Sequence, residues 1–282
     1  MNAKSCRVMI QSKHSSLTRS EKAVANFVLE NISDVLSCTV TELADKVGTS
    51  EASVVRFCKS VGFKGYQDFK ISAAMDILPP GRHLNPSLDP TDDAETVCQK
   101  VFSSEVDVLN ETLLMLDTKA LSEAARKMRE AERIAFFGSG GSLMVAMDAQ
   151  HKLLKIGRQV LLHSDADSQT MCASLLKKGD IAFGISHSGS NQRVIHCLKL
   201  ASEQKATTIG MTTQGRSPLN KVSDIMLYTS TKETVFKSES VSARIAQLAV
   251  IDSLVALIAF SDYKRSYEAI QKTRNATVGG KY

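Results

Sequence analysis

Residues 133–142 read RIAFFGSGGS and residues 181–191 read IAFGISHSGSN, and these two stretches decide the fold. In each of them a short apolar run leads into a turn rich in Ser and Gly, and an apolar-periodic stretch follows. This is the layout of a strand, a turn and a helix. Turns at the carboxyl ends of parallel strands gather in one crevice, where backbone N–H groups at helix N-termini and nearby hydroxyls can hold an anion. The two stretches therefore predict a phosphate-binding site.

The sequence around these stretches extends the same pattern into a sheet. Short apolar runs recur three more times, at residues 160–163, 207–211 and 225–228. Helical or looped crossovers separate the runs, and alternation of this kind predicts a five-stranded parallel sheet with helices on both faces. Further helices are expected at residues 94–116, 119–130 and 240–260, and a polar tail over residues 271–282.

A cluster of prolines divides the chain. Four of the five prolines fall within residues 79–90. Proline fixes φ, removes a backbone donor and biases the preceding residue away from the helix, so this segment reads as an extended linker. The sequence therefore predicts an all-α domain over residues 1–78, a linker over residues 79–92 and an α/β domain over residues 93–282.

The N-terminal part carries helical signals throughout. Thr18 and Glu21 form a capping box, and further helices are expected at residues 40–47, 50–61 and 66–77. Within residues 40–59 a helix-turn-helix is predicted, because Gly can make its turn at positive φ and Ala lets its helices approach. The positions that fit this motif are Leu43, Ala44, Val47, Gly48, Val54 and Phe57.

The second helix of this motif is expected to read a double-stranded DNA operator. Arg56 can reach a guanine edge with two hydrogen bonds, while hydroxyls and lysines suit bases and phosphates. The predicted DNA contacts are Thr49, Ser50, Glu51, Ser53, Arg56, Lys59 and Lys64. The alternative is a compact three-helix unit with a solvated charged face, in which Glu51 only complements the helix dipole.

Composition narrows the class of protein. With 43% hydrophobic and 23% charged residues the chain reads as globular. The apolar run at residues 248–260 is interrupted by Asp252 and Ser253 and falls short of the ~20 residues of a membrane span, and residues 1–11 have no signal-peptide pattern. We therefore expect no membrane partner and a cytoplasmic location.

The net charge and the cysteines give little further information about function. The net charge is +5, of which residues 1–80 carry only +2, so the case for DNA rests on pattern. The six cysteines are scattered and contain no C-x-x-C pair, which indicates reduced thiols. No metal and no cofactor are expected.

Together these features resemble the RpiR-type transcriptional regulators, in which a helix-turn-helix domain is joined to a sugar isomerase (SIS) domain that binds phosphosugars. Besides the two Ser/Gly turns, the resemblance is carried by residues 47–57 (VGTSEASVVRF), 62–66 (GFKGY), 151–157 (HKLLKIG) and 242–249 (SARIAQLA). It covers nearly the whole chain in the expected order. It implies a flavodoxin-like SIS fold for the α/β domain and says nothing of the sugar.

The resemblance also implies site residues. It places the phosphate-binding hydroxyls on Ser142, Ser186 and Ser188, and the turns add Gly140 and Gly189, where the backbone can come close to phosphate. SIS domains usually have Thr where this chain has Asn191, whose amide can still donate to phosphate. The candidates for sugar selectivity, each with the alternative of a surface or interface role, are Glu233, Lys237, Glu239, Ser240 and Arg244.

A phosphosugar isomerase is the alternative function. Isomerisation needs a base and a group that opens the ring, roles that Glu239 and His187, or His163, could take. The regulator is favoured, because an isomerase leaves the helix-turn-helix and the linker unexplained, and a DNA-binding protein without ligand leaves the phosphate turns unexplained. We expect a homo-oligomer, a dimer or tetramer, that acts as a repressor on a two-fold operator and is released by a phosphosugar.

Overall fold

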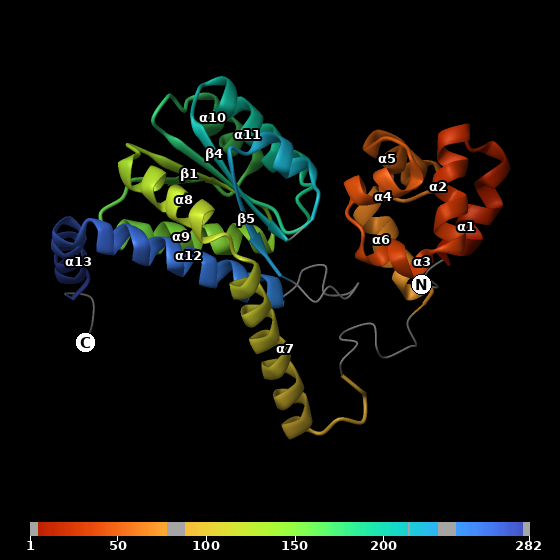
Figure 1. Ribbon diagram of the computed structural model, residues 1–282, viewed down its shortest axis with the longest axis horizontal. Helices are drawn as coiled ribbons and strands as arrows, with labels where there is room; N and C mark the ends of the chain where they lie inside the picture. The colour runs from red at the N-terminus through yellow and green to blue at the C-terminus, as the bar shows by residue number, and fades with distance from the viewer. Residues whose placement is uncertain (1–4, 78–87, 214, 231–240, 279–282) are drawn as a thin grey trace. The chain divides into compact units, whose positions relative to one another are not determined.

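Short helices build the N-terminal unit. Two units make up the computed structural model, in which residues 5–77, 88–213, 215–230 and 241–278 are described. The helices of the first unit are α1 (Cys6–Lys13), α2 (Arg19–Glu30), α3 (Ile32–Ser37), α4 (Val40–Val47), α5 (Glu51–Ser60) and α6 (Tyr66–Met75) (Figure 1). The all-α prediction is confirmed, although α1 and α3 were not foreseen because both are too short to show helical periodicity.

Helices α4 and α5 form the expected helix-turn-helix. The Thr39 hydroxyl caps α4 by accepting from the Glu42 N–H at 3.2 Å, and the Glu42 carboxylate accepts from the Thr39 N–H at 2.8 Å. Gly48 ends α4 with a φ of +72°, the left-handed conformation that its place in the turn predicts. Leu43, Val54 and Phe57 are fully buried between the helices.

The second unit contains the sheet. Its strands are β1 (Ile134–Phe137), β2 (Val160–Leu162), β3 (Ile181–Ile185), β4 (Thr207–Thr213) and β5 (Ile225–Thr229). All neighbouring pairs are parallel, in the order β2-β1-β3-β4-β5. This is the flavodoxin-like order, so the predicted five-stranded parallel sheet is confirmed. The chain also forms α7 (Ala94–Met115), α8 (Thr118–Glu130), α9 (Gly141–Lys155), α10 (Ala166–Ser174), α11 (Gln192–Glu203), α12 (Val241–Ser261) and α13 (Tyr263–Val278).

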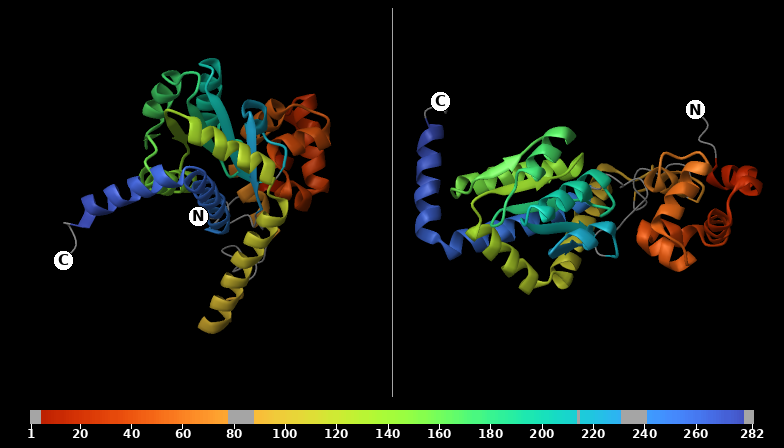
Figure 2. Two further views of the ribbon diagram at one scale, coloured as in Figure 1. Left: turned by 60° about the vertical axis from the view of Figure 1, so that its left-hand side comes forward. Right: turned by 90° about the horizontal axis from the view of Figure 1, so that it is seen from above.

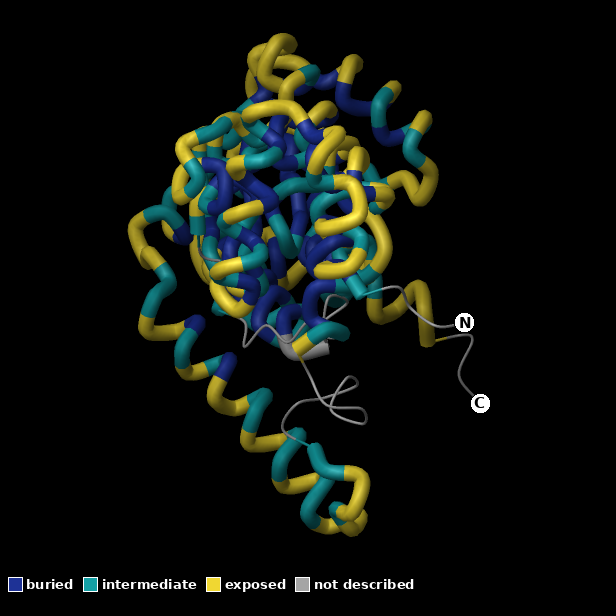
Figure 3. The backbone as a smooth tube through the Cα atoms, turned by 90° about the vertical axis from the view of Figure 1, so that its right-hand side faces the viewer, coloured by how far each residue is buried: buried dark blue, intermediate teal, exposed yellow. Residues whose placement is uncertain are grey.

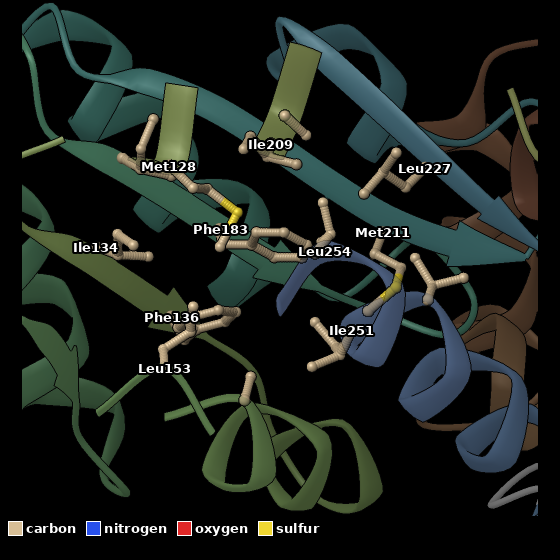
Figure 4. Packing of buried hydrophobic residues seen from close by; sticks show 14 of the residues in the cluster. Met128, Ile134, Phe136, Leu153, Phe183, Ile209, Met211, Leu227, Ile251 and Leu254 are labelled. Atoms are coloured by element: carbon tan, nitrogen blue, oxygen red, sulfur yellow. The ribbon is translucent and has the colours of Figure 1, made fainter. Parts of the chain in front are cut away.

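Alternate residues of the strands face two different helical layers. Phe136 and Phe183 stack at 4.9 Å on the face covered by α8, α9 and α12, where Ile251 and Leu254 pack (Figure 4). Phe137 faces the other layer, formed by α10 and α11 (Figure 1). The sheet is therefore buried on both faces, which explains why its strands read as continuous apolar runs.

Two helices differ from the sequence expectation. Helix α12 supplies a stretch, Ala243–Ser261, that is long and apolar enough by length and composition to cross a membrane, so the expectation that this run is too short is wrong. One side of α12 packs on the sheet through buried residues, Val250, Ile251, Leu254 and Ile258.

Residues 271–278 of the expected polar tail are helical, because α13 continues to Val278 (Figure 2). Arg158 is buried and donates to the Asp262 carboxylate at 3.2 Å, at the junction of α12 and α13. A Cβ added at Gly157 would lie 2.9 Å from the Cβ of Ala269, so α13 packs directly against the end of α9. These tertiary contacts hold a sequence of low hydrophobicity as a helix.

Helix α7 is largely exposed. Val108 and Thr112 are its buried residues, and the rest is exposed or half-buried (Figure 3). Large apolar side chains of α7, among them Phe102 and Leu114, face solvent at 73% and 87% exposure.

Candidate functional site

The two Ser/Gly turns follow neighbouring strands. Strands β1 and β3 pair in parallel, with Phe137 opposite Gly184, so the turns that leave them lie side by side. In this strand order the chain reverses direction across the sheet between β1 and β3. Open α/β sheets bind ligands in the crevice at such a switch point, outside the carboxyl ends of the strands.

The first turn leads into a helix without a side-chain cap. Gly140 is the N-cap of α9, has a φ of +54°, and leaves the first turn of the helix without a side-chain hydrogen bond. At Gly138 a Cβ would lie 3.2 Å from the backbone carbonyl carbon of Ser142, which is closer than ordinary van der Waals contact, so glycine allows the close approach of the strand end and the helix. Ser142 is half-buried in the first turn of α9. The positive end of this helix therefore remains available to an anion.

The second turn is held by its own hydroxyls. Ser186 is buried, and its Oγ accepts from the Asn191 N–H at 3.4 Å. The Ser188 Oγ accepts from the Ser190 N–H at 3.3 Å, and Ser188 is half-buried. Gly189 is buried with a φ of +61°, which lets the turn curl without a side-chain clash.

Asn191 connects the two turns. Its side-chain amide donates to the Ser139 Oγ at 2.8 Å, across 52 residues of sequence. Its Oδ1 accepts from the backbone N–H groups of Arg193 and Val194 and so caps α11. Asn191 is therefore engaged in holding the turns together, and the predicted contact between its amide and phosphate stays a prediction.

Gln169 of α10 fixes the first turn, although its role was not predicted from the sequence. Its Nε2 donates to the carbonyls of Gly138 and His163, both at 3.0 Å, and its Oε1 accepts from the Gly138 N–H at 3.3 Å. The side chain is only 6% exposed. A lone Gln inside a short helix gives no sequence signal, since the pairing depends on where α10 lies.

The sugar-side candidates are described only in part. Glu233, Lys237, Glu239 and Ser240 lie outside the described residues. Arg244 stands in the first turn of α12, and a Cβ added at Gly141 would lie 3.3 Å from its Cδ and 3.8 Å from its Nε. The structure therefore places Arg244 against the first residue of α9.

The histidines named for the isomerase alternative have structural partners. The His187 Nδ1 pairs with the Thr213 Oγ1 at 3.1 Å, and the His187 carbonyl accepts from the Thr212 hydroxyl at 3.0 Å. His163 contributes its carbonyl to Gln169. These bonds hold the second turn against β4 and the end of β2 against α10.

The predicted DNA-reading face needs a correction. Ser53 is 5% exposed and does not face outward, because it lies one turn before the buried Phe57 on the inner side of α5. Its hydroxyl lies 2.9 Å from the Ser50 hydroxyl. Ser50 caps α5, and Glu51 accepts from the Thr41 hydroxyl at 2.8 Å. Three of the residues that were predicted to contact DNA, Ser50, Glu51 and Ser53, are thus engaged in capping or packing of the helices.

The outward face of α5 is carried by other positions. Ala52, Arg56 and Lys59 are exposed along one side of the helix at the spacing of its turns. The Arg56 guanidinium donates to the Ser53 Oγ at 2.9 Å, and this bond holds the guanidinium beside the helix. Thr49 is half-buried in the turn before the helix, and Lys64 is exposed after it.

Comparison with known proteins decides the family. A model of the SIS domain matches residues 127–257, and a model of the rpiR-family helix-turn-helix domain matches residues 5–78. Over 265 residues the chain is 37% identical to an uncharacterised HTH-type transcriptional regulator of Caldanaerobacter subterraneus subsp. tengcongensis, with 94% of each chain covered. The chain belongs to the RpiR family of transcriptional regulators.

Solved structures agree with this assignment. The structure of the Vibrio vulnificus NanR protein complexed with ManNAc-6P is 30% identical to this RpiR-family chain and has a TM-score of 0.81, covering 98% of this chain and 99% of that one. A phosphoheptose isomerase from Francisella tularensis covers 59% of this chain and 98% of its own at 18% identity and a TM-score of 0.50. The isomerase shares the SIS fold alone.

Proposed function

We propose that this RpiR-family regulator is a repressor of sugar-metabolism genes whose operator binding is changed by a phosphosugar. The observation that carries the proposal is the hydrogen bond between Asn191 and Ser139, which ties two Ser/Gly turns together at the switch point of the sheet. The binding of ManNAc-6P by the Vibrio vulnificus relative supports the same class of effector.

The phosphate is held by hydroxyls and backbone. Ser142, Ser186 and Ser188 supply hydroxyl donors, and Gly140 and Gly189 let backbone N–H groups approach the oxygens. Helices α9 and α11 both begin at this edge, and their positive ends attract the dianion. Asn191 bridges the turns and adds a donor at their junction.

The DNA end of the proposal uses the outward face of α5. Arg56 reads a base edge, Lys59 and Lys64 contact phosphates, and the half-buried Thr49 lies at the entry to the helix. The division of the chain into residues 1–78, 79–92 and 93–282 is part of the same proposal. A protein of this kind works on DNA in the cytoplasm.

A homo-oligomer assembled through the SIS domain completes the proposal. The outer sides of α9 and α12 expose apolar residues, including Met144, Met147 and Phe260, at 50%, 50% and 78% exposure. The two helices are joined by Lys152, which pairs with Asp148 and Asp252, so their outer sides form one surface. A second copy that covers this surface pairs two DNA-reading units for a two-fold operator.

The regulator is preferred over an isomerase. The curated relative is named as a transcriptional regulator, and the isomerase shares the fold alone. The effector therefore acts by binding, and it changes DNA affinity only as far as it prefers one conformation of the protein over another.

Calorimetric titration of the full chain tests the effector class. ManNAc-6P and unphosphorylated ManNAc are titrated first, followed by hexose 6-phosphates and phosphorylated sugar acids. We expect a phosphorylated sugar to bind, its unphosphorylated form not to bind, and Ser188→Ala to weaken binding about tenfold or more, since a hydrogen bond to a charged group contributes about 1.5–3 kcal/mol. Ser202→Ala, an exposed serine of α11, is the control. Absence of binding across this panel contradicts the proposal.

A further inference from the structure

Arg244 stands where a cation is electrostatically unfavourable. It lies in the first turn of α12, a turn with no acidic side chain, and packs on Gly141 at the first residue of α9. The N-terminus of a helix carries a partial positive charge, so both helices repel the guanidinium. Among the described residues no carboxylate forms an ion pair with Arg244. Such an arrangement is stabilised by an anion that lies between the guanidinium and the helix ends.

A buried donor stands beside Arg244. Gln247 follows one turn later on the same side of α12 and is 1% exposed. Its Nε2 has no hydrogen-bond partner among the described residues, although a buried N–H group normally has one. Ile251, a further turn along that side, packs in the core against the sheet, so this side of the helix faces inward. The N-terminal end of α12 thus places a cation beside the first residue of α9 and carries an unused donor on the same side of the helix.

We infer that Arg244 binds the effector's phosphate and supplies the charge by which the site selects a phosphorylated ligand. This revises its expected role in sugar selectivity, and it rests on the proposed function because the phosphate site is the one proposed above. The hydroxyls of Ser142, Ser186 and Ser188 are neutral donors, so they hydrogen-bond to the phosphate whether it carries one negative charge or two. Arg244 adds a full positive charge and a planar pair of donors, which strengthens binding to the dianion most.

Binding of inorganic phosphate to the full chain tests this inference without knowledge of the sugar. Affinity is measured from the shift in Tm across a phosphate titration, with chloride at matched ionic strength as reference. Arg244→Gln is expected to lower phosphate affinity about 10- to 100-fold, and Arg244→Lys less, because it keeps the charge and loses the fork. Arg274→Gln, an exposed arginine of α13, is the control and keeps the affinity of the natural chain. Circular dichroism confirms that each variant is folded.

The outcomes separate this inference from the proposed function. If Arg244→Gln and Ser188→Ala both lose phosphate affinity and Arg274→Gln keeps it, the result supports both the role of Arg244 and the proposed function. Loss in Ser188→Ala with unchanged affinity in Arg244→Gln overturns the role of Arg244 and leaves the phosphate site in place. If the natural chain binds neither phosphate nor any phosphosugar of the panel, the proposed function fails and this inference fails with it.

Discussion

A single buried amide, that of Gln169, holds the first Ser/Gly turn in shape. Because Gln169 donates to two carbonyls and accepts from the Gly138 N–H, we expect Gln169→Glu to place a carboxylate oxygen against those carbonyls. The expected loss of unfolding free energy is about 1–3 kcal/mol, with a parallel loss of effector affinity. Urea denaturation and calorimetry measure the two. Gln204→Glu, at an exposed position, is the control, and unchanged effector affinity in Gln169→Glu refutes the role.

Glu21 makes the N-terminal unit sensitive to acid. The N–H and hydroxyl of Thr18 donate to its carboxylate, as does Ser60 at the end of α5, and these bonds hold the pKa of Glu21 below its ordinary value of 4.5. Since the folded pKa is lowered, this stabilisation is present above about pH 4.5 and is lost as pH falls through the folded pKa. Glu21→Gln is expected to lower stability at pH 7 and to flatten the decline below pH 4.5. Thermal unfolding from pH 7 to pH 3 tests this, and parallel curves for the two proteins contradict it.

We expect the reading of DNA to depend most on Arg56. We expect Arg56→Ala to lower specific operator affinity about 10- to 100-fold, since a bidentate base contact discriminates by about 1–3 kcal/mol. Effector affinity remains that of the natural chain. Fluorescence anisotropy with a labelled operator measures the loss, and Arg274→Ala, which removes the same charge outside the motif, is the control. If Arg56→Ala binds the operator as tightly as the natural chain, Arg56 does not contact the operator bases.

At the scale of elements, the turn of the helix-turn-helix depends on one backbone conformation. Gly48 has a φ of +72°, and a Cβ added there meets no atom within 4 Å. The cost of Gly48→Ala is therefore backbone strain alone, about 1–2 kcal/mol, and Gly48→Asn costs less because Asn tolerates this region better. Chemical denaturation of the three proteins measures the order. A larger loss in the Asn variant disproves the assignment to strain.

The elements differ in how far sequence could predict them. Strong local signals predicted β1, β3 and the turn at Gly48, because apolar runs and glycine report backbone geometry directly. Helix α13 was missed, since Arg158 and Gly157, both distant in sequence, hold it in place. The outward orientation of Ser53 was predicted wrongly, because the side of α5 that is covered depends on how the helix packs in the unit, where Ser53 is only 5% exposed. Gln169 was missed for the same reason, since its partners come from other elements.

At the scale of the whole molecule, we expect copies of the chain to associate through the SIS domain. Phe260 is 78% exposed on the outer surface of α9 and α12, where Met144 and Met147 are also exposed. We expect Phe260→Glu to shift the protein from a dimer or tetramer toward the monomer and to reduce operator affinity, because a two-fold operator is bound by paired units. Analytical ultracentrifugation measures the shift, and Lys264→Glu on exposed α13 is the control. A natural chain that is monomeric at all concentrations contradicts this part of the account.

The most direct test of the central claim is sequencing of genomic fragments that the purified protein retains, with and without a pool of phosphosugars. The account predicts enrichment of a near-palindromic sequence beside genes of sugar metabolism, and release of these fragments when the pool is added. If Arg56→Ala no longer retains these fragments, while Arg274→Ala retains them and releases them with the phosphosugars, DNA binding is assigned to the helix-turn-helix. No enrichment in either condition contradicts the account and turns attention to catalytic turnover of the same sugars.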